Sequence, residues 1–267
     1  MRIVKCTGCR TKLEEGKLRC PKCGKWATLG AGEIEVHNLS DVRPSDLDRI
    51  KSGPWDLVWG GGIVTDSVSL FAGQWGAGKS TLLLQIAQAV ALQDMTVLYV
   101  SREETLGRIK SRALRLTIPD AAQERIKLVS RFTGSIRDVC EAVQPKLLIL
   151  DSLSALVGVG LNDVREAVEV LTLVKDYADE MKCPGIVVSH INKKGEFSGP
   201  EAFAHLIDST IFFRKDKTQK NLRHLMPEKN RDGDVDVRVS FSMTAAGLIH
   251  VEPEETNAED EEFPETD

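Results

Sequence analysis

A glycine-rich loop between a strand and a helix constrains this chain more than any other feature. Residues 67–72 form an apolar run typical of a buried strand, and a helical run extends from Leu82 to about Gln93. The loop between them fits the G-x-x-x-x-G-K-[ST] pattern and reads Gly73, Gln74, Trp75, Gly76, Ala77, Gly78, Lys79, Ser80, Thr81. Backbone N–H groups and the helix dipole in such a loop hold phosphates. The sequence therefore predicts an ATP site, with Lys79 on the β- and γ-phosphates and Ser80 on Mg²⁺.

Two later apolar runs are predicted to be core strands whose ends approach this loop. Residues 146–151 end at Asp151, whose carboxylate would hold Mg²⁺ opposite Ser80. An acid at the end of a core strand is common, so the loop upstream is what favours the Mg²⁺ role. Residues 184–190 end at His190, which would either sense the γ-phosphate or be an ordinary structural histidine.

Residues 96–101 form a further predicted strand, which leads directly into Arg102, Glu103 and Glu104. A glutamate at the end of a strand beside the γ-phosphate can align the water that attacks it. The alternative is a pair of solvated glutamates in a turn, because surface glutamates are common.

Four of the six cysteines fall in the first 23 residues, as two Cys-x-x-Cys pairs with ten residues between them. They are Cys6, Cys9, Cys20 and Cys23. This spacing is typical of a tetrahedral structural Zn²⁺ site, and metal binding would stabilise a segment too short to build a core. Disulfides are disfavoured in a reducing cytosol. We therefore predict a zinc ribbon over residues 1–29, whose basic surface would contact nucleic acid, a partner protein or solvent.

Composition and charge set the broad class of the chain. It is 42% hydrophobic and 28% charged, without an apolar run near the ~18 residues of a membrane helix and without a secretory signal at its start. We therefore expect a cytoplasmic protein with no membrane partner. The net charge of −5 is uneven, because residues 252–267 hold nine acids and no Lys or Arg. This segment is predicted to be a disordered acidic tail, which either aids solubility or competes with nucleic acid for a basic surface.

The order of the runs predicts an α/β fold. Strand and helix patterns alternate through residue 190 and include a helix over residues 162–181, which favours a mainly parallel sheet. Residues 222–227 and 235–243 alternate apolar and polar positions, which predicts antiparallel strands added at the carboxyl end. Lys229 and Arg231 lie on the turn between them, and would either cap a solvated hairpin or reach another subunit. The resulting domain limits are 1–29 for the ribbon, 30–66 for a linker and lead-in, 67–251 for the core and 252–267 for the tail.

Taken together, these stretches resemble the bacterial RadA (Sms) family, a DnaB-like branch of the RecA-type ATPases. The resemblance extends from Cys6 to about Val251 and includes the ribbon, the loop at 73–81, the segment 97–105, Asp151-Ser152 and Lys229-Asn230-Arg231. It implies a RecA-like P-loop ATPase core in which Glu103 is the catalytic glutamate. It also implies that Lys229 and Arg231 enter the ATP site of a neighbouring subunit. The chain differs from the family at Arg102, where the family has Gly, and at Asp232, where it has Phe.

The resemblance also implies partners and a process. We expect an ATP-dependent motor that forms a homo-oligomeric, hexameric ring on single-stranded or branched DNA. It would act in recombination or repair, by branch migration or helicase-type translocation. A recombinase or replication protein would be its partner. Lys193 and Lys194 lie in a loop that would line the pore and bind phosphate, or would be a flexible surface loop. We expect a short form that lacks the family's Lon-like carboxyl-terminal domain. The alternatives are a DnaB-like replicative helicase or loader, and a nucleotide-switched regulatory ATPase or zinc-ribbon adaptor.

Overall fold

The computed structural model describes residues 3–5, 11–14, 20, 22, 40, 47–157, 164–190, 203 and 205–252. The chain divides into two compact units, Met1–Asp46 and Leu47–Asp267. In the first unit, β1 (Ile3–Lys5) pairs with β2 (Lys12–Glu14) in antiparallel register. Cys6, Cys9 and Cys23 lie outside the described residues, whereas Cys20 is described and buried.

The second unit is built on a nine-stranded sheet in the order β13-β12-β11-β10-β5-β9-β8-β6-β7. The six strands from β10 to β7 in this order run parallel, and β11, β12 and β13 extend the sheet with antiparallel pairs. The strands are β5 (Val68–Gly73), β6 (Val97–Ser101), β7 (Ile126–Val129), β8 (Leu147–Asp151), β9 (Gly185–His190), β10 (Ser209–Lys215), β11 (Leu222–Asn230), β12 (Val239–Thr244) and β13 (Gly247–Val251). The predicted fold class, a mainly parallel α/β sheet with antiparallel carboxyl-terminal strands, is confirmed.

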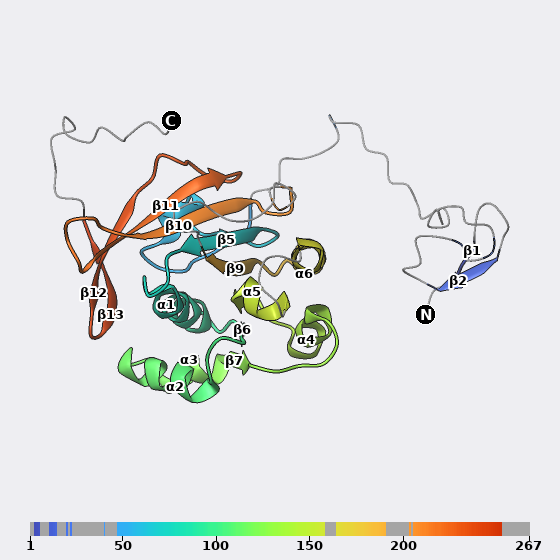
Figure 1. The fold of residues 1–267 in the computed structure, drawn as a ribbon, viewed down its shortest axis with the longest axis horizontal. Helices are drawn as coiled ribbons and strands as arrows, with labels where there is room; N and C mark the ends of the chain where they lie inside the picture. The colour runs from blue at the N-terminus through green and yellow to red at the C-terminus, as the bar shows by residue number, and fades with distance from the viewer. Residues whose placement is uncertain are drawn as a thin grey trace. The chain divides into compact units, whose positions relative to one another are not determined.

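Helices cover both faces of this sheet because side chains of the buried strands alternate between two cores. Tyr99 of β6 packs into the core with the first three helices, whereas its neighbour Leu98 packs into the core with the last three. The first group is α1 (Lys79–Ala91), α2 (Leu106–Arg115) and α3 (Asp120–Arg125). The second group is α4 (Ile136–Val143), α5 (Leu153–Val157) and α6 (Val164–Met181) (Figure 1). The loop between β5 and α1 therefore sits on a sheet that is buried on both sides.

The segment before β5 belongs to this unit more closely than its sequence indicates. It contains β3 (Arg49–Ile50), the 3-10 helix η2 (Asp56–Trp59) and β4 (Ile63–Val64). Trp55 and Trp59 are 3% and 2% exposed, and the indole of Trp59 donates a hydrogen bond to Ser69 Oγ at 2.8 Å. The compact unit therefore begins at Leu47, whereas the sequence placed the start of the core at residue 67.

The antiparallel hairpin forms as predicted, with shifted limits. β11 continues to Asn230, so Lys229 lies within a strand, and Arg231 begins the turn. β12 starts at Val239, later than the predicted residue 235. The shift follows from β10, which pairs with β11 as far as Asn230 and keeps its backbone extended.

Candidate active site

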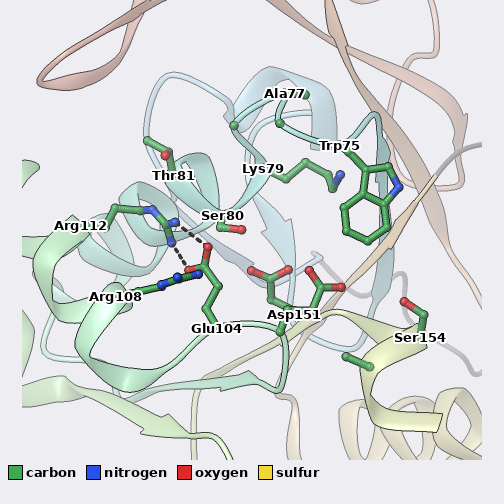
Figure 2. Close-up of a pocket in the computed structure, with 14 residues that line it drawn as sticks. Trp75, Ala77, Lys79, Ser80, Thr81, Glu104, Arg108, Arg112, Asp151 and Ser154 are labelled. Atoms are coloured by element: carbon green, nitrogen blue, oxygen red, sulfur yellow. Dashed lines mark hydrogen bonds and ion pairs between the residues drawn. The ribbon is translucent and has the colours of Figure 1, made fainter. Parts of the chain in front are cut away.

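The candidate site lies where the carboxyl ends of four parallel strands meet. β5 and β9 end in register at Gly73 and His190, and β6 and β8 end in register at Ser101 and Asp151. Ligands of open α/β sheets bind at this edge. A pocket of about 760 Å³ opens there and is lined by Trp75, Gly76, Ala77, Gly78, Lys79, Ser80, Thr81, Glu103, Glu104, Arg108, Arg112, Asp151, Ser154 and Ala155 (Figure 2). The structure thus brings the predicted phosphate loop, Asp151 and Glu103 into one cavity.

The backbone of the loop has the shape of an anion cradle. Gly76 and Gly78 have φ angles of 66° and 107°, a region that side chains with a Cβ rarely adopt. Gly78 precedes α1, and no side chain caps the N-terminus of this helix. Its first N–H groups are therefore available to a phosphate, which the helix dipole also favours.

Lys79 is held inside the loop, with 6% of the residue exposed. Its ammonium donates hydrogen bonds to the carbonyl oxygens of Gly73 at 2.7 Å and Gln74 at 3.1 Å. Burial lowers the pKa of Lys79, and the charges of Asp151 and Glu103 oppose that effect. The lysine therefore presents a poorly solvated positive charge in the pocket, which interacts strongly with a phosphate.

Asp151 is 4% exposed, and Tyr99 donates its hydroxyl to Oδ2 of this carboxylate at 2.7 Å. Burial raises the pKa of Asp151, whereas hydrogen bonds from Tyr99 and Ser80 lower it. Figure 2 shows Ser80 on the side of the pocket that faces Asp151. A carboxylate and a hydroxyl are the hard oxygen donors that Mg²⁺ prefers, so these two residues fit the ion.

The two glutamates after β6, of which the family resemblance implied Glu103 as the catalytic one, have different partners in the structure. Glu104 forms a two-pronged ion pair with Arg112, with N–O distances of 2.7 and 2.8 Å (Figure 2). Glu103 accepts a hydrogen bond from the Ser152 hydroxyl, and its charge acts on Lys79. Because Arg112 neutralises Glu104, the geometry favours Glu103 as the carboxylate available to a water molecule in the pocket.

Lys229 and Arg231 do not line this chain's own pocket. β5 and β10 run parallel, and β11 returns antiparallel with Lys229 opposite Thr210, near the start of β10. Both residues therefore lie toward the edge of the sheet opposite the phosphate loop. Lys229 donates to the Ile207 carbonyl at 2.5 Å, and Arg231, whose side chain is 49% exposed, pairs with Asp208 at 2.8 Å.

Asp208 connects this end of the hairpin to α6 and β5. It is 6% exposed, pairs with Lys175 at 3.0 Å, and accepts a hydrogen bond from the Val68 N–H at 2.8 Å. These contacts give Asp208 a structural role.

The other candidate residues are described in part or not at all. The backbone of His190 ends β9 beside Gly73, but its side chain lies outside what the structure describes. Lys193 and Lys194 also lie outside the described residues. Cys140 and Cys183 are buried, and burial raises the pKa of each thiol to about 12, which is typical of unreactive core cysteines.

Sequence reasoning missed three residues that shape the site. Tyr99 lies within an ordinary apolar strand, and Arg112 reaches Glu104 from α2. Arg223 on β11 donates its Nε–H to the carbonyl of Ala77, at 2.9 Å, within the phosphate loop. No sequence motif marks these three residues. The one available signal was for Arg112, which lies in the helix that Thr105 caps directly after the two glutamates.

Among the described residues, no helix is both long enough and apolar enough to span a bilayer.

Comparisons with known proteins place the chain in a family. A family described as "AAA domain" matches residues 35–196. Proteins named "DNA repair protein RadA" are similar over nearly the whole chain. Identity is 34% over 91% of this chain for the Mycobacterium tuberculosis protein, 32% over 92% for that of Campylobacter jejuni, and 31% over 94% for that of Escherichia coli. The chain spans 55% to 60% of the length of these relatives.

Structural comparison adds the fold. A KaiC-like protein from Pyrococcus horikoshii superposes with a TM-score of 0.64, covering 77% of this chain and 100% of that chain, at 20% identity. The core is therefore a RecA-like, KaiC-like P-loop fold, as the sequence predicted. Because the family match covers more than half of the chain and the relatives agree with it, the chain belongs to the AAA domain family, among the relatives of bacterial RadA.

Proposed function

We propose that this chain is a Mg²⁺-dependent ATPase that acts on DNA in repair or recombination. The observation that carries the proposal is the meeting of the phosphate loop, Asp151 and Glu103 in one pocket at the carboxyl edge of the sheet. The name of its relatives, DNA repair protein RadA, supports the process.

We propose a task for several residues around the pocket. The loop N–H groups and Lys79 would bind the β- and γ-phosphates, and Ser80 and Asp151 would hold Mg²⁺, which would neutralise charge on the phosphates. Glu103, oriented by the Ser152 hydroxyl, aligns the attacking water. We propose that His190, whose backbone ends β9 beside Gly73, responds to the γ-phosphate.

We further propose that the active site is completed between subunits of a homo-oligomeric, hexameric ring. Lys229 and Arg231 lie toward the opposite edge of the sheet from their own phosphate loop, and Arg231 is half exposed. A residue in that position cannot stabilise the transition state of its own chain, but it can enter the site of the next one. Lys193 and Lys194 would then bind the phosphates of single-stranded DNA in the ring and support translocation.

The cysteine spacing supports a zinc site in the first unit. Cys6 and Cys9 fall in the six-residue connection between the paired strands β1 and β2, as in a metal-binding hairpin. Cys20 is buried in the described part of the chain, which suits a thiolate ligand in a closed structural site.

The shared site can be tested by mixing two inactive variants. Lys79→Ala disables the phosphate loop and keeps Arg231, the side chain proposed to enter the neighbouring site (the finger). Arg231→Ala keeps the loop and removes the finger. Each alone should be nearly inactive with single-stranded DNA. A random equal mixture should recover about a quarter of the wild-type ATPase rate, because half of the loops are intact and half of the neighbouring fingers are intact.

The matched control for this experiment is a mixture of Lys79→Ala with Glu103→Gln. Both changes act on the same pocket in the same chain, so no combination of these subunits rebuilds an intact site. A Lys79→Ala and Arg231→Ala mixture no more active than its components would refute the shared site. ATPase activity of the wild-type chain unchanged by single-stranded DNA would argue against a DNA-driven motor.

A further inference from the structure

Arg223 is a buried cation behind the phosphate loop. It is 7% exposed and lies near the start of β11. Its Nη1 donates to the carbonyls of Lys220 at 2.7 Å and Leu222 at 2.8 Å, and its Nε donates to that of Ala77 at 2.9 Å. Within the described residues, none of its hydrogen bonds or ion pairs involves a carboxylate. Burial alone lowers its pKa, and an arginine nevertheless remains charged.

Such a residue is costly to keep. A buried charge without an opposite charge is unfavourable unless polar groups satisfy it. Two of its three carbonyl partners, those of Lys220 and Leu222, lie within three residues of Arg223, and a smaller polar side chain could donate to them as well. The third, Ala77, is 146 residues away in sequence and belongs to the phosphate loop. The contact with Ala77 is therefore the one that points to a function.

The contact fixes the direction of one N–H group. In a trans peptide, the C=O and N–H groups point to opposite sides of the chain. Because the Ala77 carbonyl faces Arg223, the N–H of Gly78 in the same peptide faces away from Arg223. Gly78 lines the pocket, so this N–H is directed toward the place of the phosphates.

The surroundings of Gly78 show why this peptide needs support. Gly78 has a φ of 107°, and a Cβ at this position would lie 2.2 Å from Cε of Met243 on β12. A glycine is therefore required here, and a glycine also makes the adjacent peptide easy to rotate. A partner for the Ala77 carbonyl removes that freedom.

We propose that Arg223 is a positioning residue for the nucleotide. It holds the peptide between Ala77 and Gly78 so that the Gly78 N–H donates to a phosphate beyond the α-phosphate, and it places a fixed positive charge behind the loop. Binding of nucleoside di- and triphosphates therefore depends on Arg223, whereas binding of nucleoside monophosphates does not. The inference rests on the proposed nucleotide site at residues 73–81.

The test is calorimetric titration of the full chain with ADP and with AMP, in the presence of Mg²⁺. Arg223→Met should weaken ADP binding roughly tenfold to a hundredfold, the effect of losing a hydrogen bond to a charged group, and should change AMP binding less than about twofold. Arg223→Lys should recover part of the ADP affinity, because it keeps the charge and one donor. Arg214→Met is the matched control, since Arg214 is exposed and stacks on Phe212 of β10.

The outcomes separate the inference from the proposed function. If the wild-type chain binds neither ADP nor ATP, the nucleotide site itself is refuted. If it binds ADP and folded Arg223→Met binds ADP equally well, or loses ADP and AMP affinity alike, the positioning role is refuted. If Arg223→Met does not fold, Arg223→Lys decides: weaker ADP binding with unchanged AMP binding supports the role, and unchanged ADP binding overturns it.

Discussion

Replacing Tyr99 with Phe tests how the buried carboxylate of the site is kept ionised. Tyr99 and Asp151 are 1% and 4% exposed, and the hydroxyl lies 2.7 Å from Oδ2. Burial and the adjacent Asp151 raise the pKa of Tyr99 well above its ordinary value, so the phenol stays protonated and donates at neutral pH. Tyr99→Phe removes only this donor and keeps the ring in its core.

The size of the effect follows from the geometry. A hydrogen bond to a charged group contributes about 1.5 to 3 kcal/mol, and one pKa unit corresponds to about 1.4 kcal/mol. The pKa of Asp151, already raised by burial, should therefore rise by a further one to two units. A raised pKa means that the folded state binds the proton more tightly than the unfolded chain. This contribution to stability is fully present below the unfolded pKa and is lost as pH rises through the folded pKa.

Two measurements read out this change. At neutral pH, the free energy of unfolding of Tyr99→Phe should fall by about 1.5 to 3 kcal/mol relative to wild type. The deficit should shrink as pH falls through the raised pKa of Asp151, because the carboxyl is then protonated in both proteins. The acid limb of the ATPase profile should move to higher pH by about one to two units, since Mg²⁺ needs the carboxylate.

The second tyrosine of the chain is the matched control. Tyr177 donates to the Cys140 carbonyl at 3.2 Å, in the core on the other face of the sheet. Tyr177→Phe should cost about 1 kcal/mol at every pH and leave the acid limb in place. A Tyr99→Phe deficit that stays the same from neutral to acidic pH, with an unmoved acid limb, would show that Tyr99 does not control the ionisation of Asp151.

Two further changes test the site and the first unit. Glu103→Gln should lower the ATPase rate by about 10²- to 10⁴-fold while nucleotide affinity stays within about twofold. Glu104→Gln should mainly lower the midpoint of thermal unfolding, because Arg112 loses its partner. Single-turnover kinetics and thermal unfolding distinguish the two variants, and a larger rate loss in Glu104→Gln would reverse the assignment. Cys20→Ser should abolish a zinc content of about one ion per chain, and metal analysis that finds the content undiminished would refute the ribbon.

The parts of the site that the sequence predicted are those in which a local pattern and a chemical requirement coincide. The phosphate loop needs small residues between a strand and a helix, and Asp151 closes an apolar strand, so both could be placed before any tertiary contact was known. The preference for Glu103 over Glu104 came from the family resemblance alone, because its physical reason depends on an arginine that α2 brings back across the pocket.

The fold before β5 was harder to read for a different reason. The glycines of residues 47–66 and Pro54 match a linker, yet Trp55 and Trp59 bury their rings in the core and give the segment a fixed place. Periodicity cannot reveal this, since the segment forms only two-residue strands and one turn of 3-10 helix.

One strand of the antiparallel addition to the sheet connects the two places at which active-site roles are proposed. β11 starts behind its own phosphate loop, where Arg223 holds Ala77, and ends toward the opposite edge, where Lys229 and Arg231 lie. A parallel strand in the same place would need a long crossover connection, whereas an antiparallel return from β10 reaches both edges directly. If both proposals hold, the same strand orients the nucleotide in one chain and carries the residues proposed for the site of the next chain.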